Sequence, residues 1–248
     1  IGETTGTAEY SPVVVNTTSA SGFVGAYISA SVVDAKSSSN NSTTNYLTRY
    51  WNISQTGVSN GVFTVTGTYI ASDVVGTVGN TAAAQLSGPF DQVSNGWKKY
   101  GALAGTTLTA TGATLADGVT SEFTGITAAN PSVVINGGDV AICAGASVPL
   151  STVVTNGLPT VVYAWSPATG LSATNVANPT ATPVATTPYT VTIYDGNGIS
   201  ASDNTTITVN PLPGEKTIND PSTCIGTAVD ITLTGSVSGV NYQLRLDS

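Results

Sequence analysis

The side chains that most often perform chemistry in proteins are few in this sequence and widely spaced. Its 248 residues include no histidine, two cysteines and fourteen acidic residues. Without histidine, the Ser-His-Asp triad, the Cys-His dyad and zinc sites with histidine ligands are excluded. A glycosidase needs only two carboxylates, but they must face each other across one bond, and the acids here are scattered singly. The sequence therefore predicts no catalytic residues and a protein that is not an enzyme.

Two glycine-containing stretches match enzyme motifs by spacing alone. Gly57-Val-Ser59-Asn-Gly61 has the spacing of a hydrolase nucleophile elbow, and Gly196-Asn-Gly198-Ile-Ser-Ala201 has that of a dinucleotide-binding loop. Both motifs need a helix directly after the glycines. Both stretches lead instead into sequence rich in Thr and Val, which favours strands. We therefore interpret both as turns.

Asp195-Gly196-Asn197-Gly198 is the one stretch whose oxygens suggest a metal. Gly and Asn tolerate positive φ, so the stretch is typical of a hairpin turn. Ca²⁺ takes six to eight oxygen ligands, and one Asp and one Asn fall well short of that number. We expect no cofactor, and a Ca²⁺ site at this turn is unsupported.

Aromatic residues supply the chemistry of one alternative, glycan binding. Tyr46, Tyr50 and Trp51 lie in the most aromatic run of the chain, and Trp97 follows later. They are candidates for stacking on sugar rings, and the alternative is a central strand with one buried face. Alternation places one set of side chains on a common face: Leu47, Arg49, Trp51 and Ile53. Arg49 would then lie beside Trp51 and stack on an aromatic ring.

The elements that must position these residues are predicted to be strands. Short alternating runs end at Gly, Pro, Asn or Asp, which is typical of half-buried strands joined by tight turns. Met is absent and Lys, Glu and Leu are scarce, which argues against helices. The predicted fold class is all-β, built from tandem antiparallel β-sandwiches with almost no helix.

Charge is sparse and mostly negative. Charged residues make up 8% of the chain, whose net charge is −8, whereas about a quarter is usual. Lys98-Lys99 is the only basic pair, so binding to a nucleic-acid backbone is not expected. No apolar run reaches the roughly 18 residues of a membrane helix. Such Ser- and Thr-rich β proteins are commonly extracellular, and with no initiator Met or signal peptide we expect a piece of a longer, mature extracellular protein.

Composition changes divide the chain into three expected modules. Residues 1–131 form a first sandwich that ends at Asn130-Pro131, and residues 132–211 form a second. Residues 212–248 begin a further module after the stiff linker Pro211-Leu-Pro213-Gly214. In the first module, the polar stretch 36–44 is predicted to be an exposed loop tip.

The second module has three predicted core residues, Trp165, Tyr189 and Cys143. Trp165 follows a strand pattern and is expected to pack across the sandwich, although an exposed sugar-stacking ring is the alternative. Tyr189 precedes Val191 by two residues and is a candidate for a tyrosine corner. Cys143 is expected to be unpaired and to act as a small buried hydrophobe.

An internal repeat supports this division. The pattern Cys-x-Gly-x-x-Val-x-(Leu/Ile) occurs at Cys143 and again at Cys224, which indicates tandem modules. Equivalent points in modules stacked end to end lie roughly 35–45 Å apart, from about 3.3 Å per strand residue. A disulfide needs Cα atoms within about 7 Å, so we expect no bond between these cysteines. A disulfide partner of Cys224 would then have to lie beyond residue 248.

Several stretches carry a resemblance to a known family. They are Cys143-Ala-Gly145, Tyr163-Ala-Trp165-Ser-Pro167-Ala-Thr-Gly170-Leu171, Asn178-Pro179-Thr-Ala, Tyr189-Thr-Val191-Thr and Asp195-Gly-Asn-Gly198. Residues 139–211 resemble the PKD-like and Ig-like repeats of very large Bacteroidota surface proteins. The resemblance implies Ig-like sandwiches, export by the type IX secretion system, and a role as cell-surface adhesins, including gliding-motility adhesins. Family members often carry a second Cys after the Asp-Gly-x-Gly turn, where this sequence has Ile199.

Three hypotheses about function follow. The first is a structural and adhesive segment whose rigid modules extend or form a surface fibre, with neighbouring repeats of the same chain as partners. The second is a carbohydrate-binding accessory module of a secreted hydrolase, which would bind surface glycans. The third is a filament subunit that assembles with copies of itself through unpaired edge strands.

Overall fold

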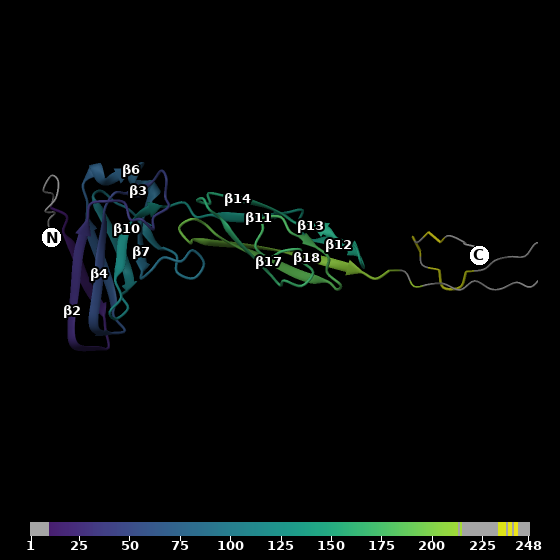
Figure 1. The fold of residues 1–248 in the computed structure, drawn as a ribbon, viewed down its shortest axis with the longest axis horizontal. Coiled ribbons are helices and arrows are strands. Elements are labelled where there is room, and N and C mark those ends of the chain that lie inside the picture. The colour runs from purple at the N-terminus through teal and green to yellow at the C-terminus, as the bar shows by residue number, and fades with distance from the viewer. Residues whose placement is uncertain (1–9, 213, 215–232, 237, 240, 243–248) are drawn as a thin grey trace, which may run out of the picture.

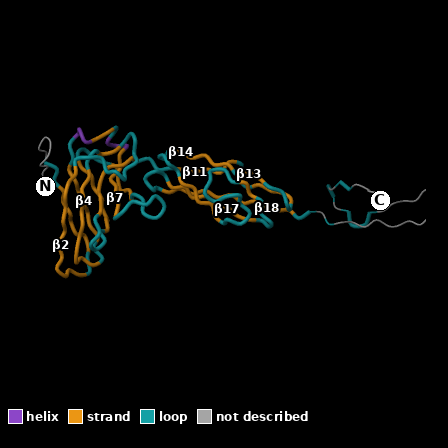
Figure 2. The backbone as a smooth tube through the Cα atoms, in the orientation of Figure 1, coloured by secondary structure: helices purple, strands orange, loops and turns teal. Residues whose placement is uncertain are grey.

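The chain folds almost entirely into strands, as its composition predicts. The computed structural model describes residues 10–212, 214, 233–236, 238–239 and 241–242. Within them, the helical elements are two single turns of 3₁₀ helix, η1 (Ala71–Asp73) and η2 (Val78–Asn80). Strands dominate the backbone in Figure 2. The predicted all-β class is confirmed.

The first sandwich packs a five-stranded sheet against a three-stranded one (Figure 1). The larger sheet has the order β2 (Gly22–Val33), β4 (Tyr50–Ser59), β10 (Ser121–Thr127), β7 (Thr81–Ser87) and β8 (Lys98–Ala102). The smaller one has the order β1 (Val13–Ser19), β5 (Val62–Thr68) and β9 (Thr107–Thr114). A short pair, β3 (Tyr46–Leu47) and β6 (Val74–Val75), lies beside them. All the pairings in these sheets are antiparallel.

The core of this sandwich follows the period of two along its strands. In β4 and β5, buried residues alternate with partly exposed ones, and Trp51 and Phe63 meet between the sheets. The face predicted around Trp51 is confirmed, because all four of its side chains are fully buried: Leu47, Arg49, Trp51 and Ile53. Burying a large apolar side chain contributes about 1.5–3 kcal/mol. This alternation therefore accounts for much of the attraction between the two sheets.

The second sandwich contains a four-stranded sheet and two short pairs. The sheet has the order β12 (Val140–Cys143), β18 (Ser200–Asn210), β17 (Thr187–Tyr194) and β15 (Val162–Ser166). The pairs are β11 (Ser132–Asn136) with β14 (Ser151–Thr155), and β13 (Val148–Pro149) with β16 (Thr180–Ala181). β12 and β18 run parallel, and the other pairings of this module are antiparallel.

Trp165 and Tyr189 lie in the core of the second sandwich, as predicted. Both side chains are buried in one cluster with Val191 and Ile193. The Trp165 Nε1–H donates to the Val176 carbonyl at 2.9 Å, and the Tyr189 hydroxyl donates to the Thr169 carbonyl at 2.7 Å. The tyrosine therefore ties its strand to a preceding loop, which is the function of a tyrosine corner, although the carbonyl lies farther back along the chain than usual.

Cys143 is exposed, so its prediction as a buried core residue is wrong. The reason is the alternation along β12, where Val140 and Ile142 turn toward the core and Ala141 and Cys143 turn outward. Adjacent strand residues cannot share a face. The expectations about Cys224 and about strands in the third module fall outside the described residues.

The two sandwiches follow one another along the long axis of the molecule (Figure 1). Their sheets contain strands from 13–127 or from 132–210, and no sheet in the described part of the chain contains both. The boundary expected at Asn130-Pro131 lies between β10 and β11.

Candidate functional site: the joint between the two sandwiches

The turn between β17 and β18 is held in shape by its first residue. The Asp195 Oδ1 accepts hydrogen bonds from the backbone N–H groups of Asn197 and Ile199, both at 3.0 Å. The Gly198 N–H donates to the Asp195 carbonyl at 2.7 Å, and Gly198 has φ +73°. The predicted turn is present, and it presents Asn197 at its tip. Asn197 is fully buried because the tip lies against the first sandwich.

The first half of the receiving surface is the loop 36–44, which sequence reasoning placed in solvent. Ser38, Asn41, Thr43 and Thr44 are exposed, but Ser37, Asn40 and Ser42 are buried, so the prediction holds for only part of the loop. The Asn40 Nδ2 donates to the Gly125 carbonyl at 3.1 Å, and the Thr127 N–H donates to the Ser42 Oγ at 2.9 Å. These hydrogen bonds hold the loop against β10 of its own sheet. The other side of the loop contacts the turn of the second sandwich.

Hydrogen bonds cross the joint in both directions between Asn41 and Ser42 on one side and Gly196 and Asn197 on the other. The Asn41 N–H donates to the Asn197 Oδ1 at 2.7 Å, and the Asn197 Nδ2 donates to the Ser42 Oγ at 3.0 Å. In return, the Asn41 Nδ2 donates to the Gly196 carbonyl at 2.5 Å. Each of these hydrogen bonds forms only at one relative position of the two sandwiches. Together they favour a single orientation of the second sandwich on the first.

Gln92 reaches the turn from a second loop of the first sandwich. Its Nε2 lies within hydrogen-bond distance of three carbonyl oxygens of the second: Thr160 at 2.5 Å, Tyr194 at 3.1 Å and Asp195 at 2.9 Å. The Trp97 N–H donates to the Asn197 carbonyl at 2.9 Å. The turn is thus hydrogen-bonded on two sides, to the loop 36–44 and to the segment from Gln92 to Trp97.

An apolar cluster lies beneath these polar contacts. Trp97, Leu86 and Ile126 are buried together in the first sandwich, and Ile199 of the second packs against them. The Ile199 side chain contributes apolar surface to the joint.

Two glycines let the backbones meet. A Cβ on Gly96 would lie 2.5 Å from the Gly198 carbonyl oxygen, and a Cβ on Gly198 would lie 2.5 Å from the Gly96 Cα. Real Cβ atoms do not approach backbone this closely, so any other residue at either position would force the modules apart.

One buried charge lies at the joint. Asp195 is fully buried, and its Oδ2 has no hydrogen-bond partner among the described residues. Burial lowers the pKa of Lys99, and the Asp195 carboxylate opposes this by favouring the charged ammonium. The Lys99 Nζ also donates to the Ala129 carbonyl at 2.7 Å and to the Asn130 Oδ1 at 3.0 Å. Lys99 therefore anchors the linker and partly offsets the buried carboxylate. In the described part of the chain, no group of three His, Cys, Asp or Glu residues could hold a metal ion.

The four candidate sugar-stacking residues are not gathered on one surface. Trp51 is fully buried in the core of the first sandwich, and Trp97 is buried in the joint, so neither ring offers a face to a sugar. Their prediction as stacking residues is wrong, because Trp51 lies on the inward face of β4 and Trp97 is covered by the packing of the joint. Tyr46 and Tyr50 are partly exposed. The Lys36 Nζ lies 4.5 Å from the centre of the Tyr46 ring.

Arg49 is part of a buried ion-pair cluster. Its Nε lies 2.8 Å from the Asp73 Oδ2, and its Nη2 lies 3.3 Å from the Asp34 Oδ1. It also donates to the Ser11 hydroxyl. This cluster ties the residues between β3 and β4 to those before β6.

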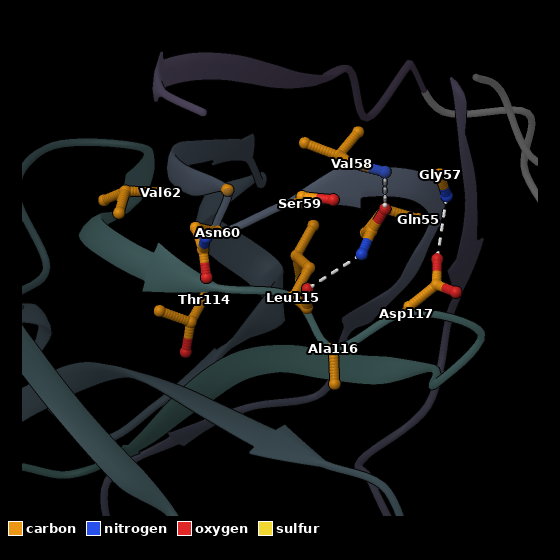
Figure 3. A pocket seen from close by; sticks show the side chains of 11 residues that line it. Gln55, Gly57, Val58, Ser59, Asn60, Val62, Thr114, Leu115, Ala116 and Asp117 are labelled. Carbon is orange, nitrogen blue, oxygen red and sulfur yellow. Dashed lines mark hydrogen bonds between the residues drawn. The ribbon is translucent and has the colours of Figure 1, made fainter. Parts of the chain in front are cut away.

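A groove of about 820 Å³ opens at the end of the first sandwich, where β4 turns into β5 (Figure 3). The Gln55 Nε2 donates to the Leu115 carbonyl at 3.1 Å, and the Asp117 Oδ1 accepts from the Gly57 N–H at 2.7 Å. Asp117 is the one acidic residue among the described residues that line it. These polar groups close the end of the sandwich, and a single carboxylate lacks the partner that glycoside hydrolysis uses.

Neither glycine motif opens a helix. Gly57–Ser59 end β4, so only Asn60 and Gly61 of the first motif form the turn to β5; Gly57 and Asn60 have positive φ. Gly196–Ala201 leads from the joint turn into β18, a strand and not a helix.

No protein-family model matches the sequence, and no match was found among curated proteins. None of the helical segments in the described residues is long and apolar enough to cross a membrane.

Proposed function

We propose that this chain is a structural and adhesive segment of a large secreted bacterial surface protein, in which rigid β-sandwich modules extend a surface fibre. The observation that supports this most is the joint, where Asn197 of one module is buried in the other. Relative motion is the default for modules linked in tandem, and this joint opposes it with buried hydrogen bonds and the apolar packing of Ile199. A fibre holds a binding tip away from a cell only if its joints resist bending.

Other features favour the same role. The sparse charge and the Ser- and Thr-rich strands suit an extracellular surface, and the resemblance of residues 139–211 to adhesin repeats suggests export to the cell surface. Under this proposal, the partners of the chain are first of all the neighbouring repeats. The joint then serves as the repeating mechanical unit of the fibre.

An in-frame deletion of residues 132–211 from the parent protein tests the proposal. We expect immunogold electron microscopy to find the protein on the cell surface, with fibres shorter by one module, and cell attachment to be reduced. Asn204→Ala, an exposed change on β18 outside the joint, is the matched control and should leave fibre length and attachment unchanged. Label confined to the cell interior would refute the proposal, as would attachment that survives loss of the whole parent protein.

A further inference from the structure

The two edges of the five-stranded sheet are protected unequally. At one edge, β8 begins with Lys98 and Lys99, and lysines on an edge strand discourage pairing with another sheet. At the other edge, β2 runs for 12 residues and contains no charged residue and no proline. Native proteins usually shorten, charge or cover such an edge.

β2 also exposes large apolar side chains. Phe23 is 63% exposed, Val24 84%, Tyr27 59% and Ile28 38%. On β1, which is an edge strand of the smaller sheet, Val14 is 51% exposed. Successive strand residues point to opposite faces, so these side chains lie in part on each face of β2 and border its free backbone edge on both sides.

The backbone of β2 is regular over most of its length. A bulge interrupts its pairing with β4 between Phe23 and Tyr27, with Gly25 at φ +57°. From Tyr27 to Val33, each residue has one partner on β4. Along an antiparallel edge, alternate residues direct both N–H and C=O outward, so this run presents a ready template for one more strand.

From this asymmetry we propose that β2 pairs antiparallel with β2 of a second copy of this chain, joining the two five-stranded sheets into one. A strand that pairs with itself about a two-fold axis is its own complement, so no separate partner sequence is required. Each copy carries a net charge of −8 and repels another at long range. Two copies can therefore associate only through a surface without charge, and the edge of β2 is such a surface.

The position of β2 allows this pairing. It lies on the side of the first sandwich farthest from the second sandwich (Figure 1). Two chains joined there keep their second sandwiches at opposite ends, clear of each other. The contact is a single pair of strands with a small apolar patch, which is at the low end of interface size. A dimer that dissociates on dilution is therefore expected.

Analytical ultracentrifugation of the full 248-residue chain tests the proposal across a concentration series. The wild type should shift from the 24.8 kDa monomer to a dimer as its concentration rises. Tyr27→Lys with Ser31→Lys places four like charges across the two-fold axis and should abolish the dimer. Thr109→Lys with Thr111→Lys makes the same change on exposed positions of β9, another edge strand, and should leave the dimer intact.

Hydrogen exchange of the wild type supplies a second test that needs no variant. Amides between Tyr27 and Val33 should be more protected at dimer-forming concentrations than after dilution, and those of β9 should not change. A wild type that stays monomeric at every concentration overturns the proposal. So does a dimer that survives the β2 lysines, or one that protects β9 in place of β2.

Discussion

Asn197 shows how much one side chain contributes to the joint. Its amide both accepts from the Asn41 N–H, in a partly buried bond, and donates to the Ser42 hydroxyl, in a buried one. Asn197→Ala removes these partners and leaves buried donors and acceptors unsatisfied. We expect a loss of about 1–3 kcal/mol in the free energy of unfolding. Urea denaturation measures it, and Asn204→Ala, an exposed asparagine on the same module, should cost much less.

Tyr100 links one residue to the pH dependence of stability. Burial raises its pKa to about 12 from the ordinary value of 10.0, and its hydroxyl donates to the Gln85 Oε1 at 2.6 Å. A raised pKa means that the folded state favours the neutral phenol. This contribution is complete below pH 10 and is lost as the pH rises through about 12.

Thermal unfolding between pH 9 and pH 12 checks this expectation. The melting temperature of the wild type should fall as the pH rises in this window, and Tyr100→Phe should remove part of the fall. Tyr10, whose side chain is exposed, supplies the control Tyr10→Phe. Equal pH profiles for the wild type and Tyr100→Phe would contradict the assignment.

At the scale of elements, the strands were easier to predict than the places where they meet. Period-two alternation is a local property, so the buried face around Trp51 and the core positions of Trp165 and Tyr189 could be found from the sequence. The buried part of the loop 36–44 could not, because its polar composition is that of a solvated tip. Its burial depends on partners more than 80 residues away in the sequence, such as Gly125 and Asn197. One signal was available: Ile199, an apolar residue directly after a polar turn.

The joint turn also makes a prediction about backbone approach. Gly198→Ala places a Cβ against Gly96, so the modules must separate, and the positive φ adds roughly 1–2 kcal/mol of strain. Gly145→Ala is the matched control, because Gly145 has φ +84° with no heavy atom near its Cβ position. Small-angle X-ray scattering should show a wider range of module orientations in Gly198→Ala alone. Equal scattering from both variants would mean that the close approach does not hold the joint.

At the scale of the whole molecule, its length depends on one short interface. Outside that interface, the two sandwiches are connected by the linker around Asn130, which Lys99 anchors. The contacts across the joint are mostly neutral hydrogen bonds and the apolar packing of Ile199, with one charge interaction between Lys99 and Asp195. Neutral bonds and apolar contacts are screened little by salt. The extended shape should therefore be a property of the chain itself.

Removal of divalent metal distinguishes this joint from one held by Ca²⁺. The Asp195 Oδ1 already accepts two backbone N–H groups, and the charge of Lys99 interacts favourably with the carboxylate. We therefore expect identical scattering profiles in EDTA and in millimolar Ca²⁺, and at 0.05 M and 0.5 M salt. If the profile loosens in EDTA, the Asp195 Oδ2 is a metal ligand, and the rigidity of the rod depends on Ca²⁺. Asp195→Asn then separates the two cases, because an amide keeps the acceptor of the turn but binds Ca²⁺ far more weakly than a carboxylate does.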